Sequence, residues 1–434
     1  MDLKELDAQF IWHPFTQQKS APTPLLIERA KGAYLYTKDG RQVFDAISSW
    51  WVNLHGHCHP KLIEAVHKQF QVLEQVIFAG MSHEPAIRLG ERLIKLLPSG
   101  FSRIFFSDNG STSVEVALKT ALQYWFNLGH PRKKIIAFRN AYHGDTFGAM
   151  SVSEPSPFNQ AFADHMFDVS YIDPPLRTQE RGRSLYQLEC LLKQSEDYAC
   201  MIYEPLVQGA GGMLMQDKDE LDQCLQLAKK HQLICIADEV MTGFGRTGRL
   251  FASEQISTPP DIICLSKGLT GGTMPLSVTA CQDWIYEAFH QDDAYKALYH
   301  GHSFTANALA CAVSHASLDL LMGDECQHSI QRITRLHTEF ARKLLSSNLS
   351  PCFKDVRVQG TILACEFNNK GESGYFNDLR HQMASFFLSN NLLLRPLGNV
   401  IYSIPPYCSE TEDLMQVYSS IEAFADANKE ALKC

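Results

Sequence analysis

The sequence has no long hydrophobic run and no excess of positive charge. No stretch of about 18 apolar residues occurs, so no membrane-spanning helix is predicted. The 39 lysines and arginines are outnumbered by 48 aspartates and glutamates, which gives a net charge of −9 and argues against nucleic-acid binding. The chain also lacks repeats, low-complexity tracts and Ser/Gly linkers. We therefore expect a globular protein that binds neither membranes nor nucleic acids.

The cysteines form no recognisable redox or metal-binding motif. There are thirteen of them, and no CxxC occurs. Several lie in apolar runs such as LICIAD and IICLS, where cysteine behaves as a small hydrophobic residue. This odd, scattered set predicts reduced thiols and a cytoplasmic protein, and the polar N-terminal segment MDLKELDAQF does not predict a signal peptide. The stretch HGHCH has no carboxylate at a suitable spacing, so we expect no metal site.

The 434 residues exceed the length at which a single core keeps growing, which predicts more than one lobe. The segment GAYLYTKDGRQVFDA predicts a hairpin. Short apolar runs then alternate with helical segments, which indicates a parallel sheet covered on both faces. The predicted strands are 103–107, 134–138, 199–205, 233–239, 262–266 and 276–281. The pattern changes near residue 311, so we predict a large domain at 50–310 and a small domain formed by 1–49 and 311–434.

Polar residues follow several of these strands, at the edge where an open parallel sheet binds its ligands. They are Gly110, Ser111, Tyr142, His143, Glu204, Asp238 and Lys267. Each has an ordinary explanation when taken alone: Gly110 and Ser111 suit a helix start, Asp238 an ion pair, and Lys267 a side chain that extends to solvent. The segment GFGR lacks both the GxGxxG pattern and a Walker lysine, so nucleotide binding is not predicted.

Together these residues match the requirements of pyridoxal 5′-phosphate. A lysine such as Lys267 forms a Schiff base with the cofactor aldehyde, and partial burial lowers the pKa of its amine. A carboxylate such as Asp238 keeps the pyridine nitrogen protonated. The helix start at Gly110 suits a phosphate, and an aromatic side chain at the same edge can stack on the ring. The sequence therefore predicts a pyridoxal-phosphate enzyme.

The chain resembles the class III (subgroup II) pyridoxal-phosphate-dependent aminotransferases. The segments that carry the resemblance are DEVMTGFGRTG and LSKGLTGG. It implies the fold type I of pyridoxal-phosphate-dependent transferases, an α/β fold with a mostly parallel seven-stranded sheet in a large domain and a smaller α+β domain. One branch of the family is matched further by IWHPFTQ, ISSWWVNLHGHCHP, EPLVQGAGGM, TGGTMPLSVTA and LLRPLGNVIYSIPPY.

The resemblance implies a role for each matching residue. Lys267 is the expected Schiff-base lysine, Asp238 the partner of the pyridine nitrogen and Tyr142 the aromatic residue on the cofactor ring; these three are the expected catalytic residues. The other expected cofactor contacts are Gly110, Ser111, His143, His302 and Ser303. The expected substrate contacts are Phe15, Trp50, Arg246, Gly301, Arg395 and Tyr402. Because the segment YHGHSFTAN is similar to one that reaches the cofactor of a partner subunit, the resemblance implies a homodimer with active sites at the interface.

The matched branch implies transamination of 8-amino-7-oxononanoate (KAPA) to 7,8-diaminononanoate in biotin biosynthesis, with S-adenosyl-L-methionine as amino donor. KAPA has an apolar chain that ends in a carboxylate, which an aromatic slot at Trp50 and the guanidinium of Arg395 would accommodate. Phe15 stands where some relatives have tyrosine, and His302 where some have proline; such changes could go with lysine as donor. An aminotransferase for another ω-amine, such as a diamine or γ-aminobutyrate, is an alternative, and a binding protein without activity is a second.

Overall fold

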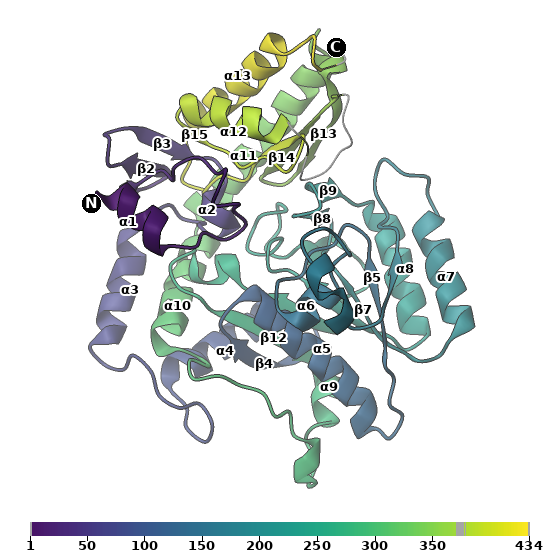
Figure 1. The fold of residues 1–434 in the computed structure, drawn as a ribbon. Coiled ribbons are helices and arrows are strands. Elements are labelled where there is room, and N and C mark those ends of the chain that lie inside the picture. Colours follow the sequence, from purple (N-terminus) through teal and green to yellow (C-terminus); the bar gives the residue numbers. More distant parts are fainter. Residues whose placement is uncertain (1, 370–376, 378, 433–434) are drawn as a thin grey trace.

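The computed structural model describes residues 2–369, 377 and 379–432. Its centre is a seven-stranded sheet with the strand order β4-β12-β11-β10-β7-β5-β6 (Figure 1). In chain order the strands are β4 (Phe101–Ser107), β5 (Lys134–Phe138), β6 (Val169–Ile172), β7 (Tyr198–Tyr203), β10 (Ile234–Asp238), β11 (Ile262–Leu265) and β12 (Ser277–Gln282). Neighbours are parallel except where β12 pairs with β11 and β4. The expected mostly parallel sheet of seven strands is confirmed, although β6 lies where no strand was predicted.

Both faces of the central sheet are covered, as the apolar runs predicted. Successive side chains of a strand point to opposite faces, so Ile135 and Ala137 of β5 belong to one core and Ile136 and Phe138 to another. The first core is completed by α5 (Gly110–Asn127), and the second by α4 (Glu84–Leu96), α7 (Arg183–Gln194) and α8 (Lys218–Lys230). This double burial fixes the sheet and leaves the strand ends available for polar residues.

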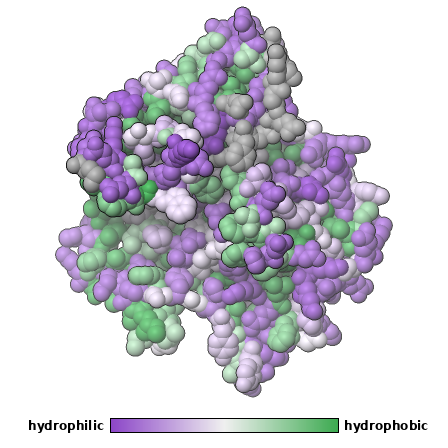
Figure 2. Space-filling model, viewed as in Figure 1, coloured by the Kyte–Doolittle hydropathy of each residue, from purple (hydrophilic) through white to green (hydrophobic). Residues whose placement is uncertain are grey.

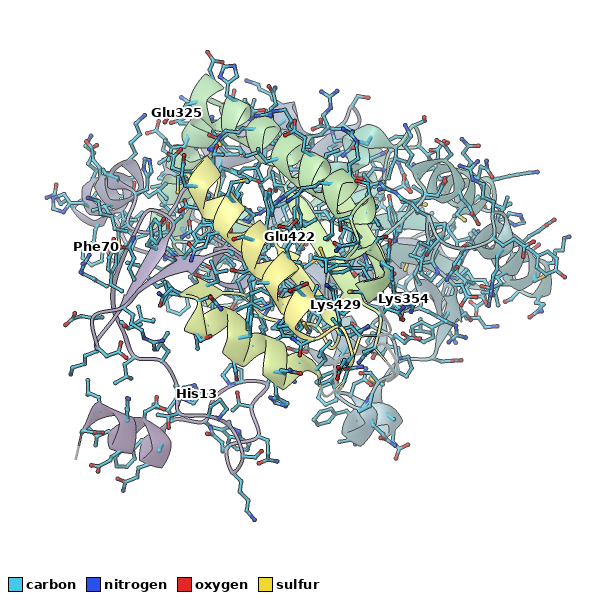
Figure 3. All side chains as sticks on the ribbon, turned by 90° about the horizontal axis from the view of Figure 1, so that it is seen from above. His13, Phe70, Glu325, Lys354, Glu422 and Lys429 are labelled. Carbon is cyan, nitrogen blue, oxygen red and sulfur yellow. The ribbon has the colours of Figure 1, made fainter. Side chains whose placement is uncertain are left out.

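A second group of elements lies above the sheet in Figure 1. Its antiparallel three-stranded sheet contains β13 (Phe353–Gln359), β14 (Ile362–Phe367) and β16 (Val400–Ser403). Its helices are α11 (Asp324–Leu345), α12 (Leu379–Ser389) and α13 (Thr411–Ala427). In Figure 3 α11 and α13 lie side by side, and Glu422 of α13 forms an ion pair of 2.7 Å with Lys343 of α11.

The N-terminal segment joins this upper group through a four-stranded sheet of β1 (Ile27–Lys31), β2 (Tyr34–Thr37), β3 (Gln42–Asp45) and β15 (Leu392–Leu393). The predicted hairpin is confirmed, because β2 and β3 pair in antiparallel register around Gly40, whose φ is +88°. Strand β15 lies parallel to β3. This pairing supports the predicted association of the N- and C-terminal segments, and the domain boundaries stay a prediction.

The remaining elements connect these layers. They are α1 (Leu3–Phe10), α2 (Ser48–Trp51), α3 (Pro60–Phe70), α6 (Phe147–Ser151), β8 (Val207–Gln208), β9 (Leu214–Met215), α9 (Asp283–Glu287), α10 (Ala308–Met322) and five short 3-10 turns, η1 (Gln160–His165), η2 (Ala252–Gln255), η3 (Lys267–Thr270), η4 (Ala294–Lys296) and η5 (Ser350–Cys352). Within the described ranges, no helix has the length and apolar character needed to cross a membrane. Figure 2 shows hydrophilic and hydrophobic side chains mixed over the visible face.

The structure shows the surroundings of the cysteines and of the histidines in HGHCH. Among the described residues eleven cysteines are free, whereas Cys352 is disulfide-bonded, so the expectation of a fully reduced set of thiols is wrong at this residue. The three histidines of HGHCH have separate partners: His55 contacts Ser317, His57 pairs with Asp45, and His59 caps α3. No cluster of three or more metal-binding side chains occurs among the residues that the structure describes.

Candidate active site

A cavity of about 2080 Å³ opens at the ends of the central strands. Ten of the predicted site residues line it: Phe15, Trp50, Gly110, Ser111, Tyr142, His143, Asp238, Lys267, Arg395 and Tyr402. They come from both ends of the chain and from four strand ends of the sheet. The parallel strands therefore bring together residues that are distant in sequence, as the strand-end pattern predicted.

Lys267 directly follows the buried strand β11 and Ser266. Its φ is +45°, a backbone conformation that is uncommon for a non-glycine residue and occurs at functional sites. Its Nζ atom lies 4.7 Å from the centre of the Trp51 ring. Burial lowers the pKa of the Lys267 amine to about 8, although the charges of Asp238 and Glu204 act in the opposite direction. The cavity therefore contains an amine that is partly neutral, and nucleophilic, near neutral pH.

Asp238 is fixed at the end of β10 by two hydrogen bonds. Its Oδ1 accepts from the Val240 N–H at 3.0 Å, and its Oδ2 lies 2.7 Å from Nδ1 of His143. Asp238 and His143 are both buried. A carboxylate oriented in this way is a fixed negative charge at the cavity wall, which is what a protonated heterocyclic nitrogen needs as a partner.

The first turn of α5 presents unpaired N–H groups to the cavity. Asn109 caps this helix, and its side chain accepts from the Thr112 N–H at 3.1 Å. The N–H groups of Gly110 and Ser111 form no hydrogen bond within the described residues. A Cβ atom on Gly110 would lie 2.6 Å from Val240 Cγ1, so glycine permits a close approach here. Free N–H groups at a helix start are an anion site.

Aromatic side chains form another wall of the cavity. The Phe15 ring lies 5.6 Å from Trp50 and 6.2 Å from Phe158, in edge-to-face geometry. The guanidinium of Arg395 lies 4.3 Å from the centre of the Trp50 ring, which is a cation–π contact. This wall offers an apolar surface next to a cation, and it suits an apolar chain that carries a carboxylate.

The family model "Aminotransferase class-III" matches residues 15–424. The chain belongs to the class-III aminotransferases. An adenosylmethionine-8-amino-7-oxononanoate aminotransferase of Synechococcus elongatus is 47% identical over 425 residues, covering 96% of this chain and 98% of that relative. The solved structure of the enzyme of the same name from Methanocaldococcus jannaschii has a TM-score of 0.91 at 33% identity and covers 99% of both chains. An amine transaminase from an uncultivated Pseudomonas species, solved in its PLP-bound form, has a TM-score of 0.88 at 27% identity over 96% of this chain and 98% of the other.

The aminotransferase uses pyridoxal 5′-phosphate, and the residues present in its cavity fit that cofactor. The free N–H groups of Gly110 and Ser111 suit the phosphate. The carboxylate of Asp238 suits the ring nitrogen, and the amine of Lys267 suits the aldehyde. Each of these groups lines the same cavity. The individual roles of these residues stay predictions.

Four of the residues predicted from the resemblance do not line the cavity in the described part of this aminotransferase: Arg246, Gly301, His302 and Ser303. Arg246 is buried, and its guanidinium donates to the carbonyl groups of Pro405 at 2.8 Å and Asn53 at 3.1 Å. Gly301 to Ser303 lie on a surface segment, where Ser303 O accepts from Gln75 at 3.0 Å. The roles of these four residues in the site stay predictions, and so does the partner subunit that the predicted roles of Gly301, His302 and Ser303 require.

Glu204, Trp51 and Phe158 also line the cavity, although no role was predicted for them from the sequence. Glu204 lies at the end of a predicted strand, so the strand-end pattern did point to it. Its oxygens accept from the N–H groups of Tyr142 at 3.1 Å and Gly209 at 2.9 Å. Burial raises the pKa of Glu204 to about 7. Trp51 donates from Nε1 to the hydroxyl of Tyr402 at 3.0 Å. Phe158 lies in a segment without periodicity, so no pattern pointed to it.

Proposed function

We propose that this aminotransferase converts KAPA to 7,8-diaminononanoate in biotin biosynthesis, with S-adenosyl-L-methionine as the amino donor. The observation that carries the proposal is the shared cavity, which contains a partly neutral amine at Lys267 and an aromatic wall with a cation at Arg395. KAPA has the matching chemistry, a ketone to be aminated at C7 and an apolar chain that ends in a carboxylate. The relatives from Synechococcus elongatus and Methanocaldococcus jannaschii carry names that agree with this assignment.

In this proposal, a few side chains of the protein each carry out one part of the reaction. Pyridoxal phosphate, when bound, supplies an aldehyde that takes up the amino group and a protonated ring that withdraws electrons. The neutral Nζ of Lys267 accepts the proton that leaves the amino-bearing carbon of the donor, and it later delivers a proton to C7 of the acceptor. Asp238, oriented by His143, provides the negative charge behind the ring nitrogen. Tyr142 lines the same cavity and gives the ring an apolar face.

Substrate selection falls to the aromatic wall. Arg395 pairs with the terminal carboxylate of KAPA through two parallel N–H···O bonds, the geometry that a guanidinium favours. Trp50 and Phe15 contact the methylene chain. Phe15 has no hydroxyl, so the amino group of KAPA finds no hydrogen-bond partner at this residue, and lysine is the alternative donor to be tested beside S-adenosyl-L-methionine.

The active unit in this proposal is a cytoplasmic homodimer, in which Gly301, His302 and Ser303 complete the site of the partner subunit. The bond between Gln75 and Ser303 joins two surface segments. Both segments carry exposed apolar side chains, which are Phe70, Val72, Ile77, Met81, Tyr299 and Phe304; Figure 3 places Phe70 at the outer edge of the molecule. Sedimentation should give twice the 48.9 kDa of one chain, and a monomer at micromolar concentration would count against the shared site.

The test of the function is product formation. Purified protein with cofactor is incubated with KAPA and S-adenosyl-L-methionine in one reaction, and with KAPA and lysine in another. The product 7,8-diaminononanoate is measured by mass spectrometry in each. We expect product with one of the two donors and none from Lys267→Ala. If neither donor gives product while γ-aminobutyrate or a diamine is deaminated, the enzyme acts on another ω-amine. Wild-type turnover by Lys267→Ala would contradict the assigned chemistry.

A further inference from the structure

Glu115, in the second turn of α5, accepts three hydrogen bonds at a single oxygen atom. Its Oε1 accepts from the Thr146 hydroxyl at 2.5 Å, the Gly148 N–H at 2.7 Å and the Ala149 N–H at 3.1 Å. The carboxylate thus connects α5 to the start of α6 through these hydrogen bonds.

Thr146 connects this carboxylate to Ser111, at the start of α5. The Thr146 N–H donates to Ser111 Oγ at 3.0 Å, and the two hydroxyl oxygens lie 2.8 Å apart. A hydroxyl has one proton, and a carboxylate only accepts. The proton of Thr146 therefore points to Glu115, and the proton of Ser111 points to Thr146 Oγ1.

Two glycines bring these groups together. A Cβ atom on Gly144, whose φ is +138°, would lie 2.3 Å from Ser111 Oγ. A Cβ atom on Gly148 would lie 2.2 Å from Oε2 of Glu115. Only a residue without a side chain permits this approach, so the hydroxyls and the carboxylate have little freedom to rearrange.

We propose that Glu115 is a positioning residue of the cofactor site, which acts through Thr146 and keeps the Ser111 hydroxyl directed into the protein. The Ser111 hydroxyl is then a link between α5 and the 144–149 segment. The N–H groups of Gly110 and Ser111, which have no other partner in the described residues, bind the cofactor phosphate. The inference rests on the cofactor of the family and does not depend on which substrates the enzyme uses.

Binding to cofactor-free protein tests this arrangement without any turnover. Pyridoxamine 5′-phosphate, which forms no covalent bond with Lys267, is titrated into wild type, Ser111→Ala, Thr146→Val and the double variant by calorimetry. Each single variant should bind about 3- to 10-fold more weakly, because a hydrogen-bonded link is lost. The double variant should be no more than about twofold weaker than either single variant, since both substitutions break one network. Thr146→Ser keeps the hydroxyl donor and Glu115→Gln keeps an acceptor oxygen, so both variants should retain most of the wild-type affinity.

The same titration with pyridoxamine, which lacks the phosphate, is the control for general damage to the fold. We expect the variants to bind pyridoxamine as the wild type does. Three results would overturn the proposal: additive losses in the double variant, a loss confined to Ser111→Ala, or equal losses for both ligands. An aminotransferase with different substrates would still show the expected network, so failure of the function and failure of this inference are separate outcomes.

Discussion

The amine of Lys267 should titrate near pH 8 in the cofactor-free protein. Burial lowers its pKa from 10.5 to about 8 because the cavity disfavours the charged ammonium group. At pH 7.5 about one amine in four is then neutral, against about one in a thousand for an ordinary lysine. The free base is the nucleophile, so the structure predicts capture of pyridoxal phosphate roughly 200-fold faster than its ordinary pKa would allow.

The assay is the rate at which cofactor-free protein captures pyridoxal phosphate, followed by absorbance between pH 6 and 10. Since the cofactor also titrates in this range, each rate is divided by the rate for Nα-acetyl-lysine under the same conditions. The rate of the protein itself should rise through a midpoint near 8 and then level off, and the ratio should fall above that pH. Lys267→Arg, which keeps a cation, gives the background. A ratio that stays constant up to pH 10 would mean that the amine has its ordinary pKa and that the burial argument is wrong.

A substitution of Glu204 gives a second test of the Lys267 pKa, because the direction in which that pKa should move is known. Its negative charge raises the pKa of Lys267, whereas burial raises the pKa of Glu204 itself to about 7. Glu204 is therefore mostly ionised over the range in which Lys267 titrates. Glu204→Gln removes this charge and should move the midpoint below 8. The Asn140 side chain and the other exposed groups at the edge of the cavity are the same in that variant and in the wild type. An unaltered midpoint would therefore mean that the charge of Glu204 does not affect the pKa of the Lys267 amine.

Three further outcomes follow from particular contacts. Arg395→Ala should raise KM for KAPA about 10- to 100-fold with a smaller change in kcat, and steady-state kinetics with KAPA and its methyl ester should show that the variant no longer distinguishes them. Asp217→Ala removes the cap of α8, where the carboxylate accepts from two N–H groups; it should cost about 1 kcal/mol of unfolding free energy in urea and leave kcat unchanged. Gly110→Ala places a Cβ atom 2.6 Å from Val240, and equilibrium dialysis should show weaker retention of the cofactor.

The strands of the central sheet could be predicted because they are short runs of apolar residues buried on both faces. β7 and β10 are buried along their whole length, so their sequences have no competing polar pattern. β6 was missed because the segment Val169–Ile172 is mostly only partly buried and its apolar residues are interrupted by Ser170. The Asp238 and Lys267 positions were accessible to the same reasoning, since a charged residue directly after a buried strand lies at the sheet edge.

The parts of the site that sequence could not give depend on contacts between distant segments. Arg246 lies in a motif that resembles a substrate contact, yet its N–H groups donate to carbonyls that are 159 and 193 residues away along the chain. Such carbonyls leave no signature in the sequence, because every residue has one. The network of Glu115, Thr146 and Ser111 is similar: each residue is an ordinary polar residue of a helix or loop, and only the packing of Gly144 and Gly148 brings them together.

The two adjacent tryptophans illustrate how backbone conformation assigns different tasks to one motif. Trp50 is 39% exposed and contacts Arg395, whereas Trp51 is 5% exposed and contacts both Tyr402 and the amine of Lys267. Ser48, Ser49 and Trp51 all have positive φ, a strained arrangement for residues with side chains. A regular strand would also separate the two rings, but it would place them on opposite faces of a sheet. The strained turn instead directs both into one cavity, so the aromatic wall and the surroundings of the amine are built from consecutive residues. This coupling explains why the motif is informative as a unit although neither tryptophan is informative alone.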